Sequence, residues 1–279
     1  MTKLEEILAA TRERVARTKK QADLRALEAA AAAHAPRGFR RRLLAMSQLG
    51  PAVIAELKKA SPSKGVLRAV FPVGQLACQL ERSGASALSV LTDEQFFQGS
   101  LAHLREASAA TDLPCLRKDF TVDEFQLLEA RAHCGDAILL ILAALDDATF
   151  RHLLTRARAL ELDALCEVHD QQELQRALEG GAEIIGINSR DLHTFQVNLD
   201  TVMELSSLIP NHVLRVAESG IATGMEIKEL HSFGYQAFLI GETLMRAEDP
   251  GKKLQQLLRE AGWYSQSATA SNGWRGTVQ

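Results

Sequence analysis

The sequence predicts an α/β fold, a closed (β/α)8 TIM barrel that is preceded by extra N-terminal helices. Short apolar runs alternate with amphipathic segments from residue 52 onward. The runs begin roughly 20–35 residues apart, which is the size of one βα unit. They are apolar throughout instead of alternating with polar residues, as in parallel strands that are covered on both faces.

Eight apolar runs are the predicted strands, at residues 52–57, 87–91, 114–118, 137–142, 164–168, 183–187, 213–218 and 237–241. Glycines, which commonly end helices, precede several of them, at Gly84, Gly135, Gly180 and Gly234. The amphipathic segments predict helices at residues 71–83, 122–134, 148–160, 171–181 and 223–234. Eight βα units in 279 residues favour a closed barrel over an open, doubly wound sheet, the main competing fold.

The two ends of the chain differ from the middle. Apolar residues recur at helical spacing in residues 1–33, and a second short helix is expected after Gly38. We therefore expect one barrel domain over residues 1–263, with a helical extension at about residues 1–47. Residues 264–279 are rich in Ser, Ala and Gly without periodicity, which predicts a flexible tail.

Composition argues against several classes of protein. A net charge of -3 provides no basic field for nucleic acid and no cationic face for an anionic membrane. The longest apolar stretch, residues 137–145, is far shorter than the ~20 residues of a membrane span, and the charged N-terminus is unlike a signal peptide. The four cysteines are scattered without a C-x-x-C pair, which argues against zinc and suits a reduced, cytoplasmic protein.

Polar residues stand where the apolar runs end. The active site of such a barrel lies at the carboxyl ends of its strands. The candidate catalytic residues are therefore Glu56, Lys58, Lys118, Glu167, Asn188, Glu218 and Ser219. Each one alone could be an exposed charge at a loop edge, but their convergence on one rim favours a set of general acids and bases.

Glycines after the last two predicted strands indicate a phosphate site. Gly220 and Gly241 leave backbone N–H groups open to an anion at the position where such barrels often bind phosphate. Residues 60–65, ASPSKG, are expected to form a turn-rich active-site loop that offers the Ser61 hydroxyl. Because many unrelated barrels share these features, they indicate the class of substrate and not the reaction.

Several blocks of sequence together resemble the indole-3-glycerol-phosphate synthase family. Residues 56–63 are similar to its ExKxxSPS signature. The other blocks follow in the same order, at residues 91–100, 116–120, 166–169, 186–192 and 217–221. The likeness runs from about residue 3 to residue 262. The resemblance also implies extra helices before the barrel.

The resemblance implies a carboxy-lyase of tryptophan biosynthesis that needs no metal or other cofactor. The family converts 1-(2-carboxyphenylamino)-1-deoxyribulose 5-phosphate to indole-3-glycerol phosphate and releases carbon dioxide and water. By resemblance, Lys118 protonates the sugar ketone as the anthranilate carbon attacks it. Lys58 would pair with the anthranilate carboxylate until that group leaves.

The later dehydration needs a second acid and a base. Glu56, Glu167 and Asn188 are the candidates, and the sequence does not divide the steps among them. Glu218 and Ser219 would orient the substrate and neighbouring side chains. His169, just past Glu167, is expected to support the site or its loop and not to act in catalysis.

The resemblance also implies substrate contacts at Ser61, Phe97, Leu142, Arg190, Gly220, Gly241 and Glu242. The two glycines and the Glu242 backbone would hold the phosphate, and Phe97 and Leu142 would enclose the aromatic ring. Glu242 stands where some relatives have Ser. Because a carboxylate repels phosphate, its side chain is expected to turn away and leave only its N–H for binding.

Two other functions remain as alternatives. One is another phosphate-sugar barrel enzyme, such as phosphoribosylanthranilate isomerase, but a catalytic Cys would then be expected where this chain has Glu56 and Lys58. The other is a non-catalytic phosphate-ligand-binding barrel, which would be expected to have lost Lys118 or Glu167. The expected partner is a small phosphorylated molecule, and the expected assembly is a monomer or homodimer.

Overall fold

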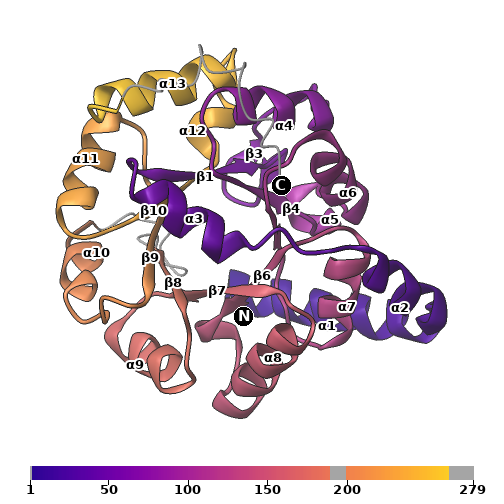
Figure 1. Ribbon diagram of the computed structural model, residues 1–279. Helices are drawn as coiled ribbons and strands as arrows, with labels where there is room; N and C mark the ends of the chain where they lie inside the picture. Colours follow the sequence, from indigo (N-terminus) through magenta and orange to yellow (C-terminus); the bar gives the residue numbers. More distant parts are fainter. Residues whose placement is uncertain (1, 189–198, 264–279) are drawn as a thin grey trace, which may run out of the picture.

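Eight parallel strands close into a barrel in this computed structural model, which describes residues 2–188 and 199–263 (Figure 1). Their order around the barrel is β1-β10-β9-β8-β7-β6-β5-β4. They are β1 (Ala52–Leu57), β4 (Ala87–Leu91), β5 (Cys115–Lys118), β6 (Ala137–Ile141), β7 (Asp163–Val168), β8 (Ile184–Asn188), β9 (Leu214–Glu218) and β10 (Ala237–Ile240). The eight predicted strands are confirmed to within one residue at each end, because nearly all of their residues are buried and the runs are accordingly apolar.

Helices surround the barrel on its outer side (Figure 1). The longer ones are α4 (Val73–Arg82), α6 (Leu101–Ala110), α7 (Phe125–Ala132), α8 (Asp147–Ala159), α9 (Gln171–Glu179), α10 (Leu199–Ser206), α11 (Gly224–Ser232) and α13 (Pro250–Glu260). Three short helical turns follow strand ends, namely α5 (Glu94–Phe97), η1 (Leu142–Ala144) and α12 (Glu242–Met245). No helix in the described ranges is long and apolar enough to cross a membrane.

Three helices precede the barrel: α1 (Lys3–Gln21), α2 (Leu24–Ala33) and α3 (Phe39–Ser47). The helical pattern of residues 1–33 is confirmed, but it divides in two at Asp23. The Asp23 side chain accepts a hydrogen bond from the Ala26 N–H at 3.1 Å and so caps the start of α2. Helix α3 begins after Gly38, whose φ of 75° is a left-handed conformation that glycine adopts without strain.

The barrel encloses its own apolar core. Alternate residues of each strand point inward, and this inner cluster includes Ile54, Leu116 and Leu165. Phe39 and Leu43 of α3 belong to the same cluster and are fully buried, so α3 closes one end of the barrel. A second, larger cluster fills the space between the strands and the outer helices.

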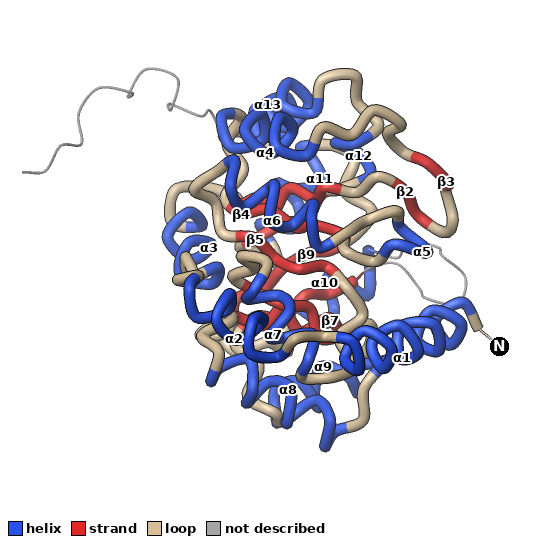
Figure 2. Tube along the Cα trace, turned by 90° about the vertical axis from the view of Figure 1, so that its right-hand side faces the viewer, coloured by secondary structure: helices blue, strands red, loops and turns tan. Residues whose placement is uncertain are grey.

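The opposite end of the barrel carries the loops that follow the strands. Figure 2 shows α3 at one end, with α1, α5 and a small hairpin toward the other. The hairpin consists of β2 (Ala60–Ser61) and β3 (Gly65–Val66), which pair antiparallel. It forms where the sequence predicts only a turn-rich loop. The predicted tail at residues 264–279 lies outside the described residues.

Removing the aromatic ring of Phe39, which packs into one end of the barrel, should destabilise the protein. We expect Phe39→Ala to lower the free energy of unfolding by about 3–5 kcal/mol, because the vacated volume cannot collapse fully. Urea denaturation followed by circular dichroism measures the change. Leu49→Ala is the control, since Leu49 is 75% exposed and should change stability by less than about 0.5 kcal/mol. Equal stabilities of Phe39→Ala and the wild type would show that α3 does not support the barrel.

Candidate active site

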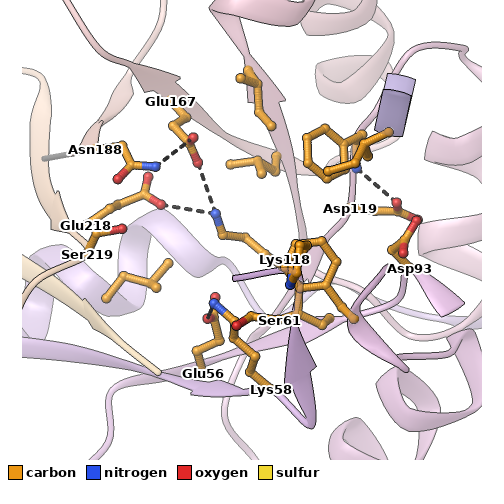
Figure 3. Close-up of a pocket in the computed structure, with 18 of the residues that line it drawn as sticks. Glu56, Lys58, Ser61, Asp93, Lys118, Asp119, Glu167, Asn188, Glu218 and Ser219 are labelled. Carbon is orange, nitrogen blue, oxygen red and sulfur yellow. Dashed lines mark hydrogen bonds and ion pairs between the residues drawn. The ribbon is translucent and has the colours of Figure 1, made fainter. Parts of the chain in front are cut away.

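A cavity of about 170 Å³ opens at the carboxyl end of the strands. The polar side chains at the base of this cavity follow the inward-facing apolar residues of the barrel core along the same strands. The polar residues are Glu56, Lys118, Glu167, Asn188 and Glu218, each two positions after an inward residue of the same strand. Strand alternation thus brings five side chains from five strands to one point (Figure 3).

Lys118 lies at the centre of this group. Its Nζ donates to Glu167 Oε2 at 3.0 Å and to Glu218 Oε2 at 3.1 Å (Figure 3). The Asn188 amide donates to the other Glu167 oxygen, Oε1, at 3.0 Å. The three charged side chains are 14% exposed or less, so the ammonium is held between two buried carboxylates.

The surroundings shift the pKa values of these three groups in different directions. Burial alone would lower the pKa of Lys118, but the charges of Glu167 and Glu218 outweigh it and raise that pKa. Burial opposes ionisation of Glu167, yet Lys118, His169 and Asn188 hold its pKa well below the usual range. Burial, with the like charge of Glu167, raises the pKa of Glu218 to about 7 despite Lys118. Near neutral pH the cluster therefore contains a cation, an anion and a carboxyl group able to exchange a proton.

A second charged pair lies at the carboxyl end of β1, where Glu56 is in the strand and Lys58 directly follows it. Lys58 Nζ is 3.6 Å from Glu56 Oε1, and the buried Ser89 hydroxyl donates to Glu56 Oε2 at 3.2 Å. Ser89 was not among the predicted site residues, although its inward position on β4 could have indicated it. The predicted Ser61 also lines the cavity, on the β2–β3 hairpin.

An aromatic and aliphatic wall faces these charged groups. Phe97 and Phe120 line the cavity with ring centroids 6.4 Å apart, and Lys58 Nζ lies 5.7 Å from the Phe97 ring centre. The structure corrects the expectation for Leu142, which is buried in the outer cluster and does not line the cavity. Ile141, one residue earlier, faces inward and takes that place, because alternate residues of a strand point to opposite sides.

The predicted phosphate-binding glycines lie in an adjoining cavity of about 280 Å³. Ser219, Gly220 and Gly241 line it together with Glu242 and Arg246. Arg246 Nε lies 2.9 Å from Glu242 Oε1, so the carboxylate that seemed unsuited to a phosphate site has a cation beside it. Sequence reasoning missed Arg246, one helical turn after Glu242.

Two glycines are required by the charged groups themselves. A Cβ on Gly186 would overlap the Glu218 carboxylate, and a Cβ on Gly241 would lie 2.5 Å from Glu56 Oε1. A larger residue at either position would therefore displace a carboxylate of the site, whatever the nearby ligand. Gly186 was not a predicted site residue, and a glycine within a buried strand was the signal that could have found it.

Helix α1 supplies part of the cavity wall that the sequence did not predict. Lys3, Leu4 and Ile7 line it, together with residues that lie far away in the chain. The predicted Arg190 lies outside the described residues. Within residues 2–188 and 199–263, no group of three or more His, Cys, Asp or Glu side chains is placed to hold a metal ion.

The raised pKa of Glu218 predicts a titration that infrared spectroscopy can follow. The absorption of a protonated carboxyl group should disappear as pH rises through about 7, well above the range in which exposed carboxyls titrate. Glu218→Gln should lack this change. Glu167→Gln should retain it at lower pH, because the like charge that raises the Glu218 pKa is gone. Persistence of the change in Glu218→Gln would contradict the assignment.

Comparison with solved structures identifies the fold. A 3-hexulose-6-phosphate synthase has a TM-score of 0.61 at 13% identity, with 75% of this chain and 99% of that chain covered. A thiamine phosphate pyrophosphorylase from Pyrococcus furiosus has a TM-score of 0.56 at 16% identity, with 78% and 98% covered. At these identities the likeness shows the barrel fold alone.

Comparison of sequences identifies the family. A family model described as indole-3-glycerol phosphate synthase matches residues 4–257. An indole-3-glycerol phosphate synthase of Koribacter versatilis (strain Ellin345) is 51% identical over 255 residues, which cover 91% of this chain and 98% of that protein. The expectation from the sequence blocks is confirmed: this chain belongs to the indole-3-glycerol phosphate synthase family.

Proposed function

We propose that this site closes the indole ring of 1-(2-carboxyphenylamino)-1-deoxyribulose 5-phosphate and forms indole-3-glycerol phosphate, carbon dioxide and water. This is the carboxy-lyase reaction of the family in tryptophan biosynthesis, and the match over residues 4–257 supports it. The single observation that carries the proposal is the position of Lys118. Its ammonium lies between two carboxylates in a cavity with an aromatic wall on one side, and a glycine-lined cavity adjoins it.

The substrate has three parts that match three parts of the site. Its aromatic ring packs on Phe97, Phe120 and Ile141. Its carboxylate pairs with Lys58, and its phosphate occupies the cavity that Gly220 and Arg246 line, where backbone N–H groups and a guanidinium suit an anion. This arrangement holds the anthranilate carbon close to the sugar ketone, which is the main requirement of an intramolecular ring closure.

Lys118 acts as the acid of the first step. When the anthranilate carbon attacks the ketone, negative charge develops on the ketone oxygen, and a strongly basic alkoxide draws a proton even from an ammonium of raised pKa. The ring carboxylate then leaves as carbon dioxide, and the electron pair of the broken bond restores the aromatic ring. Glu167 and Glu218 hold Lys118 in place and stabilise its charge beforehand.

Glu56 and Lys58 act in the dehydration. Loss of carbon dioxide removes the anionic partner of Lys58, which can then protonate the departing hydroxyl. Glu56, 3.6 Å away, takes the proton from the adjacent carbon, so that water leaves and the pyrrole ring forms. Glu167 suits this role less well, because hydrogen bonds of 3.0 Å from Lys118 and Asn188 hold its two oxygens. The contacts to the oxygens of Glu56 are longer, at 3.6 Å and 3.2 Å. Ser61 and Ser219 contribute hydroxyl contacts to the substrate.

We further propose that residues 1–263 act as one domain, since α1 contributes Lys3 and Leu4 to the cavity wall. A cytoplasmic location is consistent with four cysteines that form no disulfide among the described residues. We expect a monomer or homodimer, which sedimentation would distinguish. The reaction as proposed needs a small phosphorylated substrate and no added cofactor.

Conversion of the substrate to a fluorescent indole product tests the proposal directly. The wild type should give signal, and Lys118→Met should lose about 10²- to 10⁴-fold in kcat, because the acid of the first step is gone. Lys58→Met should also be strongly impaired. Lys59→Met is the matched control, since Lys59 is the next residue of the chain and does not line the cavity.

A wild type that binds the substrate without turnover would favour the phosphate-binding barrel. A wild type that acts only on phosphoribosylanthranilate would favour the isomerase. Equal effects of Lys58→Met and Lys59→Met would remove Lys58 from the mechanism.

Arg246 should contribute to phosphate binding. We expect Arg246→Ala to raise KM about tenfold with little change in kcat. The phosphate stays bound throughout the reaction, so its contacts stabilise the bound substrate and the transition state equally. The inhibition constant of inorganic phosphate should rise in parallel. Arg259→Ala on α13 is the control, and an Arg246→Ala variant with the KM of the wild type would exclude the contact.

A further inference from the structure

His169 is a partly buried histidine that the proposed reaction does not use. It follows β7, two residues after Glu167, in the turn that leads into α9. Its side chain is 14% exposed, and it does not line the cavity. Any influence on the reaction must therefore pass through a neighbouring group.

The imidazole ring lies between two carboxylates. Its Nε2 is 3.4 Å from Glu167 Oε1, and its Nδ1 is 3.1 Å from Glu173 Oε2 on α9. Glu173 Oε2 also accepts a hydrogen bond from the His169 backbone N–H at 2.9 Å. The Asp170 side chain caps α9 by accepting from the Glu173 N–H at 2.8 Å. This local network fixes both the ring and the carboxylate that orients it.

Two flanking carboxylates favour the doubly protonated ring. Burial would lower the pKa of His169, but Glu167 and Glu173 outweigh it and raise that pKa to about 10. The ring nitrogens then both carry protons. Nδ1 is hydrogen-bonded to Glu173, whereas Nε2 lies within ion-pair distance of Glu167 Oε1 without a hydrogen bond. A pKa of about 10 predicts a cationic ring near neutral pH.

We propose that the His169 imidazolium is a positioning residue that keeps Glu167 ionised and correctly oriented beside Lys118. The inference rests on the proposed function, because its purpose is to prepare the acid of the first step. Asn188 fixes the same oxygen of Glu167 but carries no charge. Without His169, Lys118 would be the one cation in direct contact with Glu167 among the described residues. Its proton transfer to the substrate would then leave that carboxylate without a cationic partner.

The positive charge of His169 matters most at the moment when Lys118 gives up its proton. Three side chains from neighbouring strands face Glu167: Lys118 of β5, Asn188 of β8 and Glu218 of β9. Glu56 of β1 lies further away. When Lys118 gives up its proton, the cluster loses its central positive charge. The His169 imidazolium remains and keeps Glu167 from taking the proton or rotating away. Lys118 can then take up a proton from solvent in its original place, which replaces the one proton that each turnover consumes.

Two substitutions of His169 separate the effect of its charge from the effect of its N–H donors. His169→Gln keeps a neutral N–H donor, and His169→Leu removes both donor and charge. We expect kcat to fall about 10- to 100-fold in His169→Leu and less in His169→Gln, with KM changed by less than about twofold. His152→Asn is the matched control, because His152 also lies beside a glutamate, at 3.3 Å from Glu124, but on the outer surface. It should behave as the wild type.

The pH profile distinguishes a positioning role from a structural one. Because the pKa of Glu167 is held low, its ionised form persists as pH falls in the wild type. Loss of the imidazolium should raise that pKa, so protonation of Glu167, followed by its infrared absorption across the pH range, should occur at higher pH in His169→Leu than in the wild type. Glu167→Gln should lack this absorption, which separates it from the absorption of Glu218 near pH 7. A lower melting temperature with an unchanged profile would overturn the proposal.

Nuclear magnetic resonance of the ring nitrogens tests the charge without substrate. The wild-type His169 should remain doubly protonated at pH 8 and titrate near 10, and Glu173→Gln should lower its midpoint. A neutral ring at pH 7, or a His169→Leu variant with the kcat of the wild type, would overturn the inference. A wild type with no turnover would instead overturn the proposed function, and the titration would still decide the state of His169.

Discussion

The site depends on the ammonium of Lys118 between two carboxylates in the barrel interior. Moving such charges out of water is costly unless every one of them is paired and hydrogen-bonded. Glu167 meets this requirement with Lys118 on one oxygen and Asn188 on the other. Glu218 meets it in part by a raised pKa, which lets it carry a proton near neutrality. The low-dielectric setting that makes the cluster costly also strengthens its action on a developing charge.

Strand alternation explains why so much of the site could be predicted. The apolar runs define the barrel, and the last inward position of each run is fixed once its end is known. Glu56, Lys118 and Glu218 follow from this rule alone. The same rule places Ile141, and not Leu142, at the last inward position of its run. Ser89 is the inward residue before the last one of its run, so alternation also places it on the inner face beside Glu56. Both positions therefore follow from the local pattern, without information about distant segments.

Other features depend on packing between distant segments, which periodicity does not encode. The contribution of Lys3 and Leu4 to the cavity requires α1 to lie across the mouth of the barrel. The role of Gly186 depends on the carboxylate of Glu218 from the neighbouring strand. In the sequence, Arg246 is an ordinary helix-surface residue, and only the fold brings it to the same cavity as Gly220 and Gly241. In each case the residue type is informative only when its neighbour is known.

A charge network also connects the N-terminal extension to the site. Arg14 of α1 lies 2.9 Å from Asp119, which directly follows Lys118, and Asp119 is paired with the buried Arg117 at 3.0 Å. Arg14 is also 3.9 Å from Asp93, the residue that caps the turn carrying Phe97. The guanidinium of Arg14 thus links the end of the strand that carries Lys118 with the turn that carries Phe97. Because α1 provides both this link and part of the cavity lining, the extension belongs to the site as much as the strands do.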